Sequence, residues 1–149
     1  MVASARQEAN RRLLRARDVM DRSYADALDI EALADSVHLS RAHFIRSFRD
    51  TFGETPHRYL QRRRIERAMA LLRETDRPVT EISLDVGFWS LGTFSRTFNE
   101  IVGTSPSAYR ERAQAAPRAA IRAGVPGCIA MAWDRPSSTF GEERRAGRD

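Results

Sequence analysis

The residues best suited to binding chemistry in this sequence are its arginines. All 25 basic residues are arginine and none is lysine. Codon bias can produce such exclusive use, but guanidinium groups also bind phosphates and guanine edges through paired hydrogen bonds. Seven arginines lie between Ser40 and Arg64 against two acidic residues, so this segment carries +5, equal to the net charge of the whole chain. This charge favours an anionic partner, although an arginine run on a helix is often only a solvated face.

Catalytic and metal-binding motifs are missing from the sequence. One cysteine, Cys128, excludes an internal disulfide, and the histidines His38, His43 and His57 do not have the i, i+4 spacing of metal ligands. No nucleophile is paired with a base, no carboxylates are paired on one face, and no glycine-rich phosphate loop occurs. We therefore expect no enzyme activity, metal or cofactor. Since no signal peptide and no apolar run near 18 residues is present, we also expect a cytoplasmic protein without a membrane partner.

The sequence contains an internal repeat with a period of 50 residues. Nine positions between 31 and 59 are identical to the residue 50 positions later, whereas about two matches are expected from ordinary composition. Two copies indicate a duplicated module rather than a solenoid. The identical pairs are Glu31/Glu81, Asp35/Asp85, Ser40/Ser90, Phe44/Phe94, Arg46/Arg96, Phe48/Phe98, Gly53/Gly103, Pro56/Pro106 and Tyr59/Tyr109.

Each copy predicts a short helix, a tight turn and a longer helix. In the first copy, Asp29 caps the short helix and Ser40 caps the longer one, which ends at Gly53. In the second copy, the longer helix begins after Ser90 and ends at Gly103. This order of elements is that of the helix-turn-helix unit. We expect the first unit at about residues 29–53 and the second at about 79–103.

The longer helices have similar apolar faces and different outward faces. The apolar faces, expected in the core, comprise Phe44, Phe48, Thr51 and Phe52 in the first copy and Phe94, Phe98, Ile101 and Val102 in the second. The outward faces share only an arginine. They comprise Ala42, Ile45, Arg46 and Arg49 in the first copy and Gly92, Ser95, Arg96 and Asn99 in the second. One scaffold with two different faces suits the recognition of two unlike DNA half-sites.

A long helix is predicted between the two copies, at about residues 55–75. It begins at Pro56 and contains no further glycine or proline. Twenty residues span roughly 30 Å, close to the ~34 Å of one turn of B-DNA. Such a linker helix would hold the two longer helices about one turn apart. The arginines at 62–64 on this helix either contact phosphates or face solvent.

The segment ISLDVGFWSLGTFSRTFNEIVGTSPSAYR, Ile82 to Arg110, resembles the signature of the AraC/XylS family of bacterial transcription regulators. The GF, S, FSR, F, G, SP and YR elements of that signature are present, and Ser83 replaces the usual small alanine. The resemblance covers about residues 11–112. It implies an all-α DNA-binding domain of seven helices, with two helix-turn-helix units joined by a linker helix. It also implies that the two recognition helices enter consecutive major grooves of an asymmetric site.

The resemblance further assigns roles to individual residues. Arg46 and Arg96 are the strongest candidates for base contacts, because arginine commonly binds guanine O6 and N7; a surface salt bridge with Asp50 is the alternative for Arg46. The apolar candidates either meet thymine methyl groups or are ordinary exposed aliphatics. The expected base-reading residues are Ala42, Ile45, Arg46, Leu91, Gly92, Ser95 and Arg96, and the expected phosphate contacts are Ser40, Arg41, Arg49, Arg63 and Ser90.

Two residues at the start of the second recognition helix have two interpretations each. Gly92 costs roughly 1 kcal/mol relative to alanine inside a helix. One interpretation is that Gly92 provides clearance for a close approach to DNA, as Ala42 would in the first copy. The other is that it is a tolerated glycine near a helix end. Trp89 either packs on the sugar-phosphate backbone or shields the turn.

The resemblance also bears on regulation and assembly. Most family members carry a further sensory or dimerisation domain, whereas only about ten residues precede the first expected helix, Arg11 to Ser23. The residues of that helix region expected to face inward are Leu13, Leu14, Met20 and Tyr24. The chain thus resembles the small stand-alone members, so we expect a monomer on DNA with no small-molecule effector. Family members are more commonly activators that contact RNA polymerase, in the bacterial cytoplasm at the nucleoid.

We expect the DNA-binding domain to occupy residues 1–112 and a largely irregular tail to occupy residues 113–149. The tail combines three prolines with ten charged residues, which disfavours a packed core. Within it, the apolar run Cys128 to Trp133 is consistent with a short strand, a docking segment, a partner contact or a thiol switch. The alternative to DNA recognition is a protein-interaction module on the same scaffold, which the arginine on both outward faces disfavours.

Overall fold

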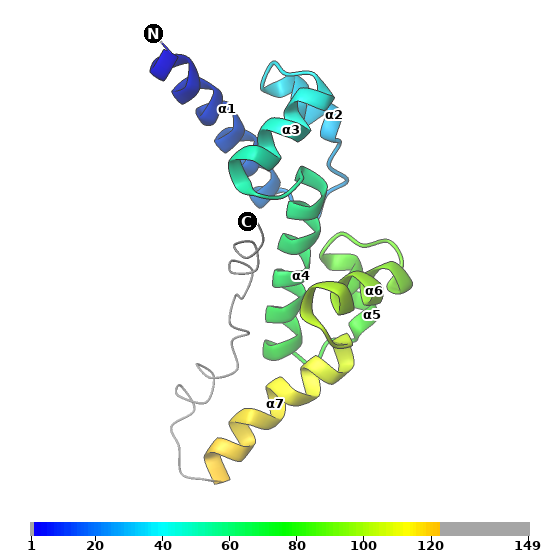
Figure 1. The fold of residues 1–149 in the computed structure, drawn as a ribbon. Helices are drawn as coiled ribbons and strands as arrows, with labels where there is room; N and C mark the ends of the chain where they lie inside the picture. The colour runs from blue at the N-terminus through cyan, green and yellow to red at the C-terminus, as the bar shows by residue number, and fades with distance from the viewer. Residues whose placement is uncertain (1, 123–149) are drawn as a thin grey trace, which may run out of the picture. The chain divides into compact units, whose positions relative to one another are not determined.

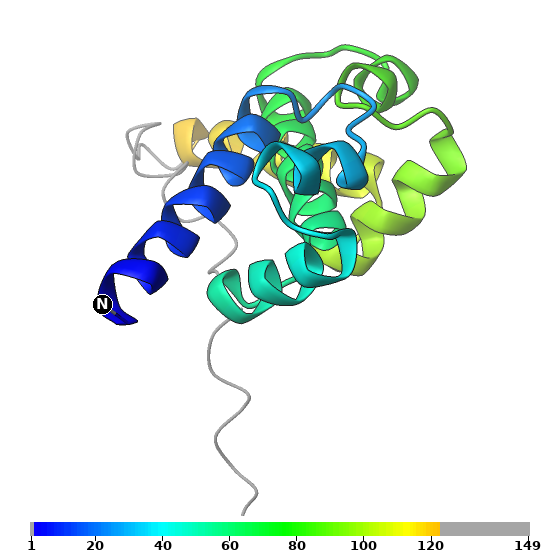
Figure 2. The same ribbon diagram turned by 90° about the horizontal axis from the view of Figure 1, so that it is seen from above.

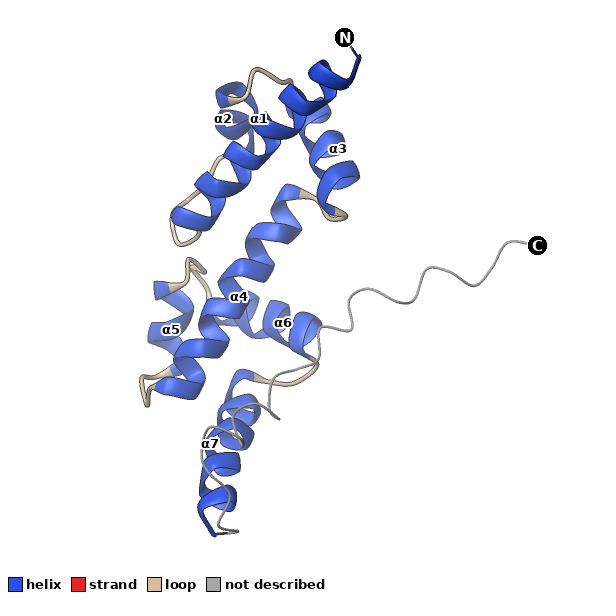
Figure 3. Ribbon diagram, turned by 90° about the vertical axis from the view of Figure 1, so that its left-hand side faces the viewer, coloured by secondary structure: helices blue, strands red, loops and turns tan. Residues whose placement is uncertain are grey.

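The computed structural model describes residues 2–122, which contain helices and connecting turns but no strand (Figures 1 and 3). The prediction of an all-α domain with two helix-turn-helix units and a linker helix is confirmed. None of the helices in this range is long and apolar enough to cross a membrane. The segment Cys128 to Trp133 lies outside the described residues. The helices are α1 (Val2–Arg22), α2 (Ile30–Ser36), α3 (Arg41–Phe52), α4 (Pro56–Glu74), α5 (Val79–Asp85), α6 (Leu91–Val102) and α7 (Pro106–Arg122).

The chain divides into two compact units, Met1–Tyr109 and Arg110–Asp149. The first unit contains α1 to α6 and the first turn of α7. Helix α7 itself continues to Arg122, ten residues past position 112, where the folded domain was expected to end. Five of the residues from 113 to 122 are alanine, the strongest helix former, and their propensity accounts for the continuation.

Helix α1 covers the first helix-turn-helix unit, α2 and α3. Its inward residues Leu13, Ala16 and Met20 are at most 1% exposed. The helix begins at Val2 rather than near Arg11. The expectation that Leu14 faces inward is wrong, since Leu14 is 40% exposed. Successive helical residues are turned by about 100°, so the burial of Leu13 directs Leu14 away from the core.

Helix α4 is shared by the two halves of the first unit. Its first part packs against α1 and α3, and its later part packs against α5 and α6 (Figures 1 and 2). The buried residues of α1 recur on α4 52 positions later, and every member of these pairs is at most 1% exposed. Helix α4 therefore covers α5 and α6 as α1 covers α2 and α3. The recurring pairs are Leu13/Ile65, Ala16/Ala68 and Met20/Leu72.

The aromatic core is built the same way in both halves. Ring centroids lie 5.7 Å apart in the pair Phe44–Phe48 and 5.7 Å apart in the pair Phe94–Phe98. The second phenylalanine of each pair contacts a tyrosine at 5.6 Å, Tyr59 in the first half and Tyr109 in the second. One residue expected in the core, Thr51, is exposed. It lies at the edge of the apolar face of α3, where its hydroxyl keeps access to water.

Capping residues fix where the two recognition helices begin and end. The hydroxyl of Ser40 accepts a hydrogen bond from the His43 amide at 3.3 Å, and that of Ser90 accepts one from the Thr93 amide at 3.0 Å. Both helices end at a glycine in the left-handed conformation, with φ of 81° and 85°. Helices α3 and α6 thus have the same length and the same ends.

Candidate nucleic-acid interface

The outward face of α3 is accessible along its length. Ala42, Arg46 and Arg49 are exposed, and Ile45 is half-buried. Helix α3 is oriented by Phe44 and Phe48 on its opposite face, which are fully buried. Their burial prevents the helix from rotating about its axis, so the four outward residues remain on the surface.

The outward face of α6 is equivalent and chemically different. Gly92 and Arg96 are exposed, Ser95 is half-buried, and Leu91 is 42% exposed. Compared with α3, this face replaces Ile45 by a serine and Ala42 by a glycine. The repeat-equivalent arginines Arg46 and Arg96 therefore lie in unlike surroundings on the two helices.

Arg46 and Arg96 are available to bind a partner. Among residues 2–122, neither guanidinium forms an ion pair or a hydrogen bond. In particular, Arg46 does not form the salt bridge with Asp50 that the sequence allowed. A guanidinium that is hydrated and unpaired can bind a guanine edge without first losing an intramolecular partner.

The beginnings of α3 and α6 suit contact with phosphate. The first backbone N–H groups of a helix and its dipole attract anions. Ser40 and Ser90, both exposed, use their hydroxyls as caps, and the Ser90 hydroxyl also donates to Thr93 Oγ1 at 3.1 Å. Arg41 is exposed in the first turn of α3 and has no ion pair within the described part of the chain. Phosphate contacts by these residues and by Arg49 stay predictions.

The arginines at 62–64 are half-buried and have partners within the protein. Arg62 pairs with Glu54 at 2.7 Å and with Glu66. Burial by itself lowers the pKa of Arg62, but the hydrogen bonds and charges of these two glutamates raise it above the ordinary value. The side chain also lies over the Tyr59 ring, 5.1 Å from its centroid. Arg62 therefore joins the start of α4 to the turn before it.

Arg63 is held in the same way by acids on two helices. Its Nε lies 3.0 Å from Asp21 on α1, and its Nη1 lies 2.7 Å from Glu66 on α4. The charge on these partners raises the pKa of Arg63 even though burial lowers it. The phosphate contact expected of Arg63 from the sequence would require these ion pairs to be exchanged.

Arg64 has contacts that the sequence did not indicate. Its Nε donates to the Tyr24 carbonyl at 2.6 Å and its Nη2 to the Asp26 carbonyl at 2.8 Å. These acceptors are backbone atoms about 40 residues away, so no residue pattern could have identified them.

Gly92 has space around it within the protein. A Cβ built at this position would find Ser90 Oγ as its nearest neighbour, at 3.8 Å. Nothing in the chain therefore requires a glycine there. The space is consistent with either interpretation of Gly92, clearance for DNA or a tolerated glycine.

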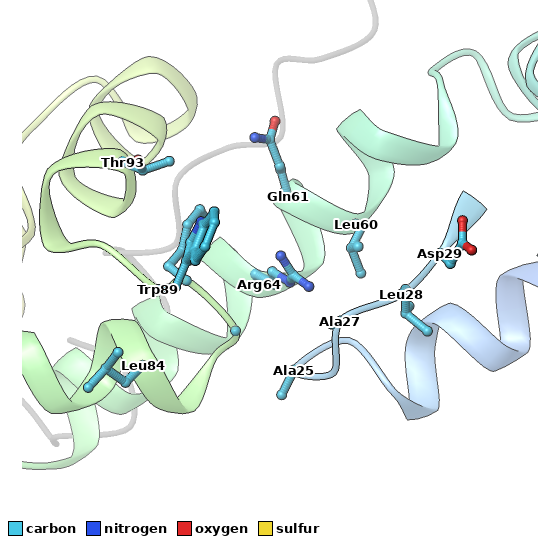
Figure 4. Close-up of a pocket in the computed structure, with 12 residues that line it drawn as sticks. Ala25, Ala27, Leu28, Asp29, Leu60, Gln61, Arg64, Leu84, Trp89 and Thr93 are labelled. Carbon is cyan, nitrogen blue, oxygen red and sulfur yellow. The ribbon is translucent and has the colours of Figure 1, made fainter. Parts of the chain in front are cut away.

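Trp89 does not shield the turn that precedes α6. Its side chain is 92% exposed, and Leu84 on α5 is 58% exposed. Trp89 lines a pocket of about 630 Å³, together with residues of α4, α5, α6 and the loop between α1 and α2 (Figure 4). No three His, Cys, Asp or Glu side chains in residues 2–122 gather closely enough to hold a metal ion.

Comparison with known proteins gives consistent matches. A helix-turn-helix domain family matches residues 33–112. The MmsAB operon regulatory protein of Pseudomonas aeruginosa is 38% identical over 85 residues, 57% of this chain and 28% of that protein. Regulatory protein SoxS of Salmonella typhimurium is 34% identical over 93 residues, 62% of this chain and 87% of SoxS. The chain thus spans less than a third of the longer relative but most of the shorter one.

A solved structure with the same fold contains DNA. The DNA-binding domain of AdpA, a global transcriptional factor crystallised with a target DNA, superposes with a TM-score of 0.66 at 31% identity. The superposition covers 69% of this chain and 93% of that domain. The match therefore extends over nearly the whole AdpA domain.

Proposed function

Because this chain belongs to the AraC/XylS family of helix-turn-helix transcriptional regulators, we propose that it places α3 and α6 in consecutive major grooves of an asymmetric DNA site. Arg46 and Arg96 contact guanine in the two half-sites. The neighbouring residues Ala42 and Ile45 read the first half-site, and Leu91, Gly92 and Ser95 read the second. The different chemistry of the two sets gives the site its asymmetry.

The observation that supports this proposal most strongly is the pair of unpaired arginines at repeat-equivalent positions. Each lies on the exposed face of a recognition helix whose opposite face is fully buried. The shared helix α4, with 19 residues, is roughly 28 Å long at about 1.5 Å per residue. This length is compatible with successive major-groove faces about one turn apart.

The phosphate contacts are proposed at the edges of each recognition helix. Ser40 and Arg41 lie at the beginning of α3, Arg49 lies near its end, and Ser90 lies at the beginning of α6. Contacts of this type orient a protein on DNA without reading its sequence. They would fix the angle at which each recognition helix enters its groove.

We also infer that the protein binds as a monomer and that it activates transcription, the commoner mode in its family. An asymmetric site with two unlike half-sites needs one copy of the chain, because α3 and α6 supply both recognition helices. Activation would proceed through contact with RNA polymerase, at the nucleoid in a bacterial cytoplasm. These inferences rest on the family to which the chain belongs.

Selection of bound sequences from a random DNA pool tests the proposal directly. We expect the enriched sequences to contain two unlike motifs about one helical turn apart, and footprinting of one site to protect two adjacent major grooves on one face. A palindromic product would contradict the asymmetric monomer. Enrichment of no motif at all would contradict sequence-specific recognition.

A protein-interaction module is the second candidate, and the exposed Trp89 and Leu84 favour it. Salt dependence separates the two functions. A DNA-binding protein loses affinity steeply as salt rises, because counterions are released from the phosphates it contacts. We expect this behaviour with duplex DNA, and binding that is weak and independent of salt would favour the second candidate.

A further inference from the structure

The two halves of the first unit approach each other at a junction in addition to sharing α4. The junction consists of the loop residues Tyr24 to Asp26, Arg64 in the middle of α4, and the turn residues Gly87 and Phe88 of the second helix-turn-helix unit. Arg64 donates to two carbonyls of the loop, at 2.6 and 2.8 Å. Its guanidinium carbon also lies 5.9 Å from the centroid of the Phe88 ring. One side chain therefore contacts both halves (Figure 4).

Gly87 brings the turn into direct contact with the loop. Its φ of +100° belongs to the left-handed region, which side chains disfavour. A Cβ at this position would lie 2.9 Å from the Ala25 carbonyl oxygen and 2.9 Å from Arg64 Nε. Backbone of the first half and backbone of the second half thus approach more closely here than any residue with a side chain would permit.

Charge does not explain the position of Arg64. The neighbouring Arg62 and Arg63 pair with acids, whereas Arg64 forms no ion pair within residues 2–122. Its side chain is half-buried, and burial lowers its pKa from the ordinary value. A partly dehydrated cation without a carboxylate partner is unfavourable unless its donors are used. The planar fork of arginine satisfies two carbonyls at once, a geometry that the single ammonium of lysine does not provide.

We propose that Arg64 is a positioning residue, which fixes the orientation of the second helix-turn-helix unit relative to the first and thereby sets the half-site spacing that the protein accepts. The part of this inference that concerns half-site spacing rests on the proposed function. The physical reason is geometric, because one base pair added between two half-sites turns the second by about 35° and shifts it by about 3.4 Å. A protein tolerates that change only if α6 can reorient relative to α3.

The test uses DNA sites selected with the 149-residue chain and altered by one base pair between the half-sites. Arg64→Lys keeps the charge and removes the two-carbonyl fork. Arg67→Lys is the matched control, since Arg67 is an exposed residue on the same helix. Gly87→Ala disturbs the junction from the other side.

We expect the wild type and Arg67→Lys to bind the altered spacings about tenfold more weakly than the native spacing, a penalty of the size of a mismatched base pair. For Arg64→Lys and Gly87→Ala we expect the preference for the native spacing over the altered spacings to fall to about twofold, while affinity for a single half-site is unchanged. An unchanged preference in both junction variants would overturn the inference. An equal loss of affinity by these variants for every DNA, including the single half-site, would overturn the inference as well.

A second measurement needs no DNA and separates this inference from the proposed function. Spin labels at Asp50→Cys and Glu100→Cys, in a Cys128→Ser background, report the distance between α3 and α6 at exposed, repeat-equivalent positions. We expect a narrow distance distribution in the labelled protein and a broader one after Arg64→Lys. If the wild type bound no specific DNA, the proposed function would fail, and an unbroadened distribution would still refute the role of Arg64.

Discussion

The hydroxyl of Tyr59 on α4 donates a hydrogen bond of 2.6 Å to the carboxylate of Asp21 on α1. The repeat-equivalent tyrosine, Tyr109, has the reverse arrangement and accepts a hydrogen bond of 2.6 Å from Arg73. Arg73 lies 52 positions after Asp21, the same offset that relates the buried residues of α4 to those of α1. The repeat therefore preserves the position of the hydroxyl contact and exchanges an acidic partner for a basic one.

Because of the contact between Tyr59 and Asp21, we expect the free energy of unfolding to vary with pH in the alkaline range. Burial, together with the hydrogen bond and charge of Asp21, raises the pKa of Tyr59 from 10.0 to about 12. Since the folded-state pKa lies above the unfolded value, this stabilisation is fully present below pH 10 and is lost as pH rises through about 12. We expect Tyr59→Phe to lose about 1–2 kcal/mol of unfolding free energy at pH 8.

Urea denaturation at several pH values between 8 and 11.5 measures this effect. The stability difference between the wild type and Tyr59→Phe should shrink as pH rises above 10, because ionisation of Tyr59 then stabilises the unfolded state, and only the wild type has this group. A difference that stays constant over this range would show that the proton on Tyr59 does not contribute.

Replacement of Arg96 by alanine tests the base contact in the second half-site. We expect affinity for the selected site to fall by about 1–3 kcal/mol, the value of a bidentate contact with guanine, and affinity for random DNA to fall much less. The relaxed preference should appear at one base position in a panel of single-substitution sites. Equal losses on specific and random DNA would show that Arg96 contacts phosphate instead.

Replacement of Arg41 by alanine tests a phosphate contact. We expect affinity to fall on all sequences alike, and the slope of log affinity against log salt to become shallower by about 1. Fluorescence anisotropy at four or more salt concentrations measures the slope. An unchanged slope would exclude a phosphate contact by Arg41.

Arg63→Ala provides the contrasting case. Because its guanidinium pairs with Asp21 and Glu66, we expect a lower unfolding free energy and little change in the salt slope of the protein that remains folded. Thermal melting and the same salt titration measure both effects. A shallower slope with unchanged stability would instead support the phosphate contact expected from the sequence.

Gly92→Ala separates clearance for DNA from a tolerated glycine. The open space at this position should allow alanine to raise stability by up to about 1 kcal/mol through its helix propensity. If the glycine provides clearance, affinity for the selected site should nevertheless fall. Full affinity of Gly92→Ala for the selected site would refute the clearance interpretation.

The sequence by itself determined the repeat, the capping residues and the faces of the recognition helices. Ser40, Ser90, Gly53 and Gly103 act locally, through hydrogen bonds and backbone angles within a few residues, so their spacing was sufficient to predict both helices. The exposure of Arg46 and Arg96 followed from the 3.6-residue period and the buried phenylalanines opposite them. These features depend on residues that are close in sequence, so the sequence alone was sufficient to predict them.

Only the tertiary structure decided what the arginines at 62–64 contact. Their shared position on a charged helix predicted phosphate or solvent, but Arg63 pairs with Asp21 on another helix and Arg64 with backbone carbonyls of a distant loop. Leu14 was likewise misplaced, and the exposure of Trp89 excludes one of its two interpretations, shielding of the turn. Both outcomes depend on which elements cover the side chain. Contacts across some 40 residues arise from how α1, α4 and α5 pack together, and backbone acceptors leave no trace in the identity of the residues that carry them.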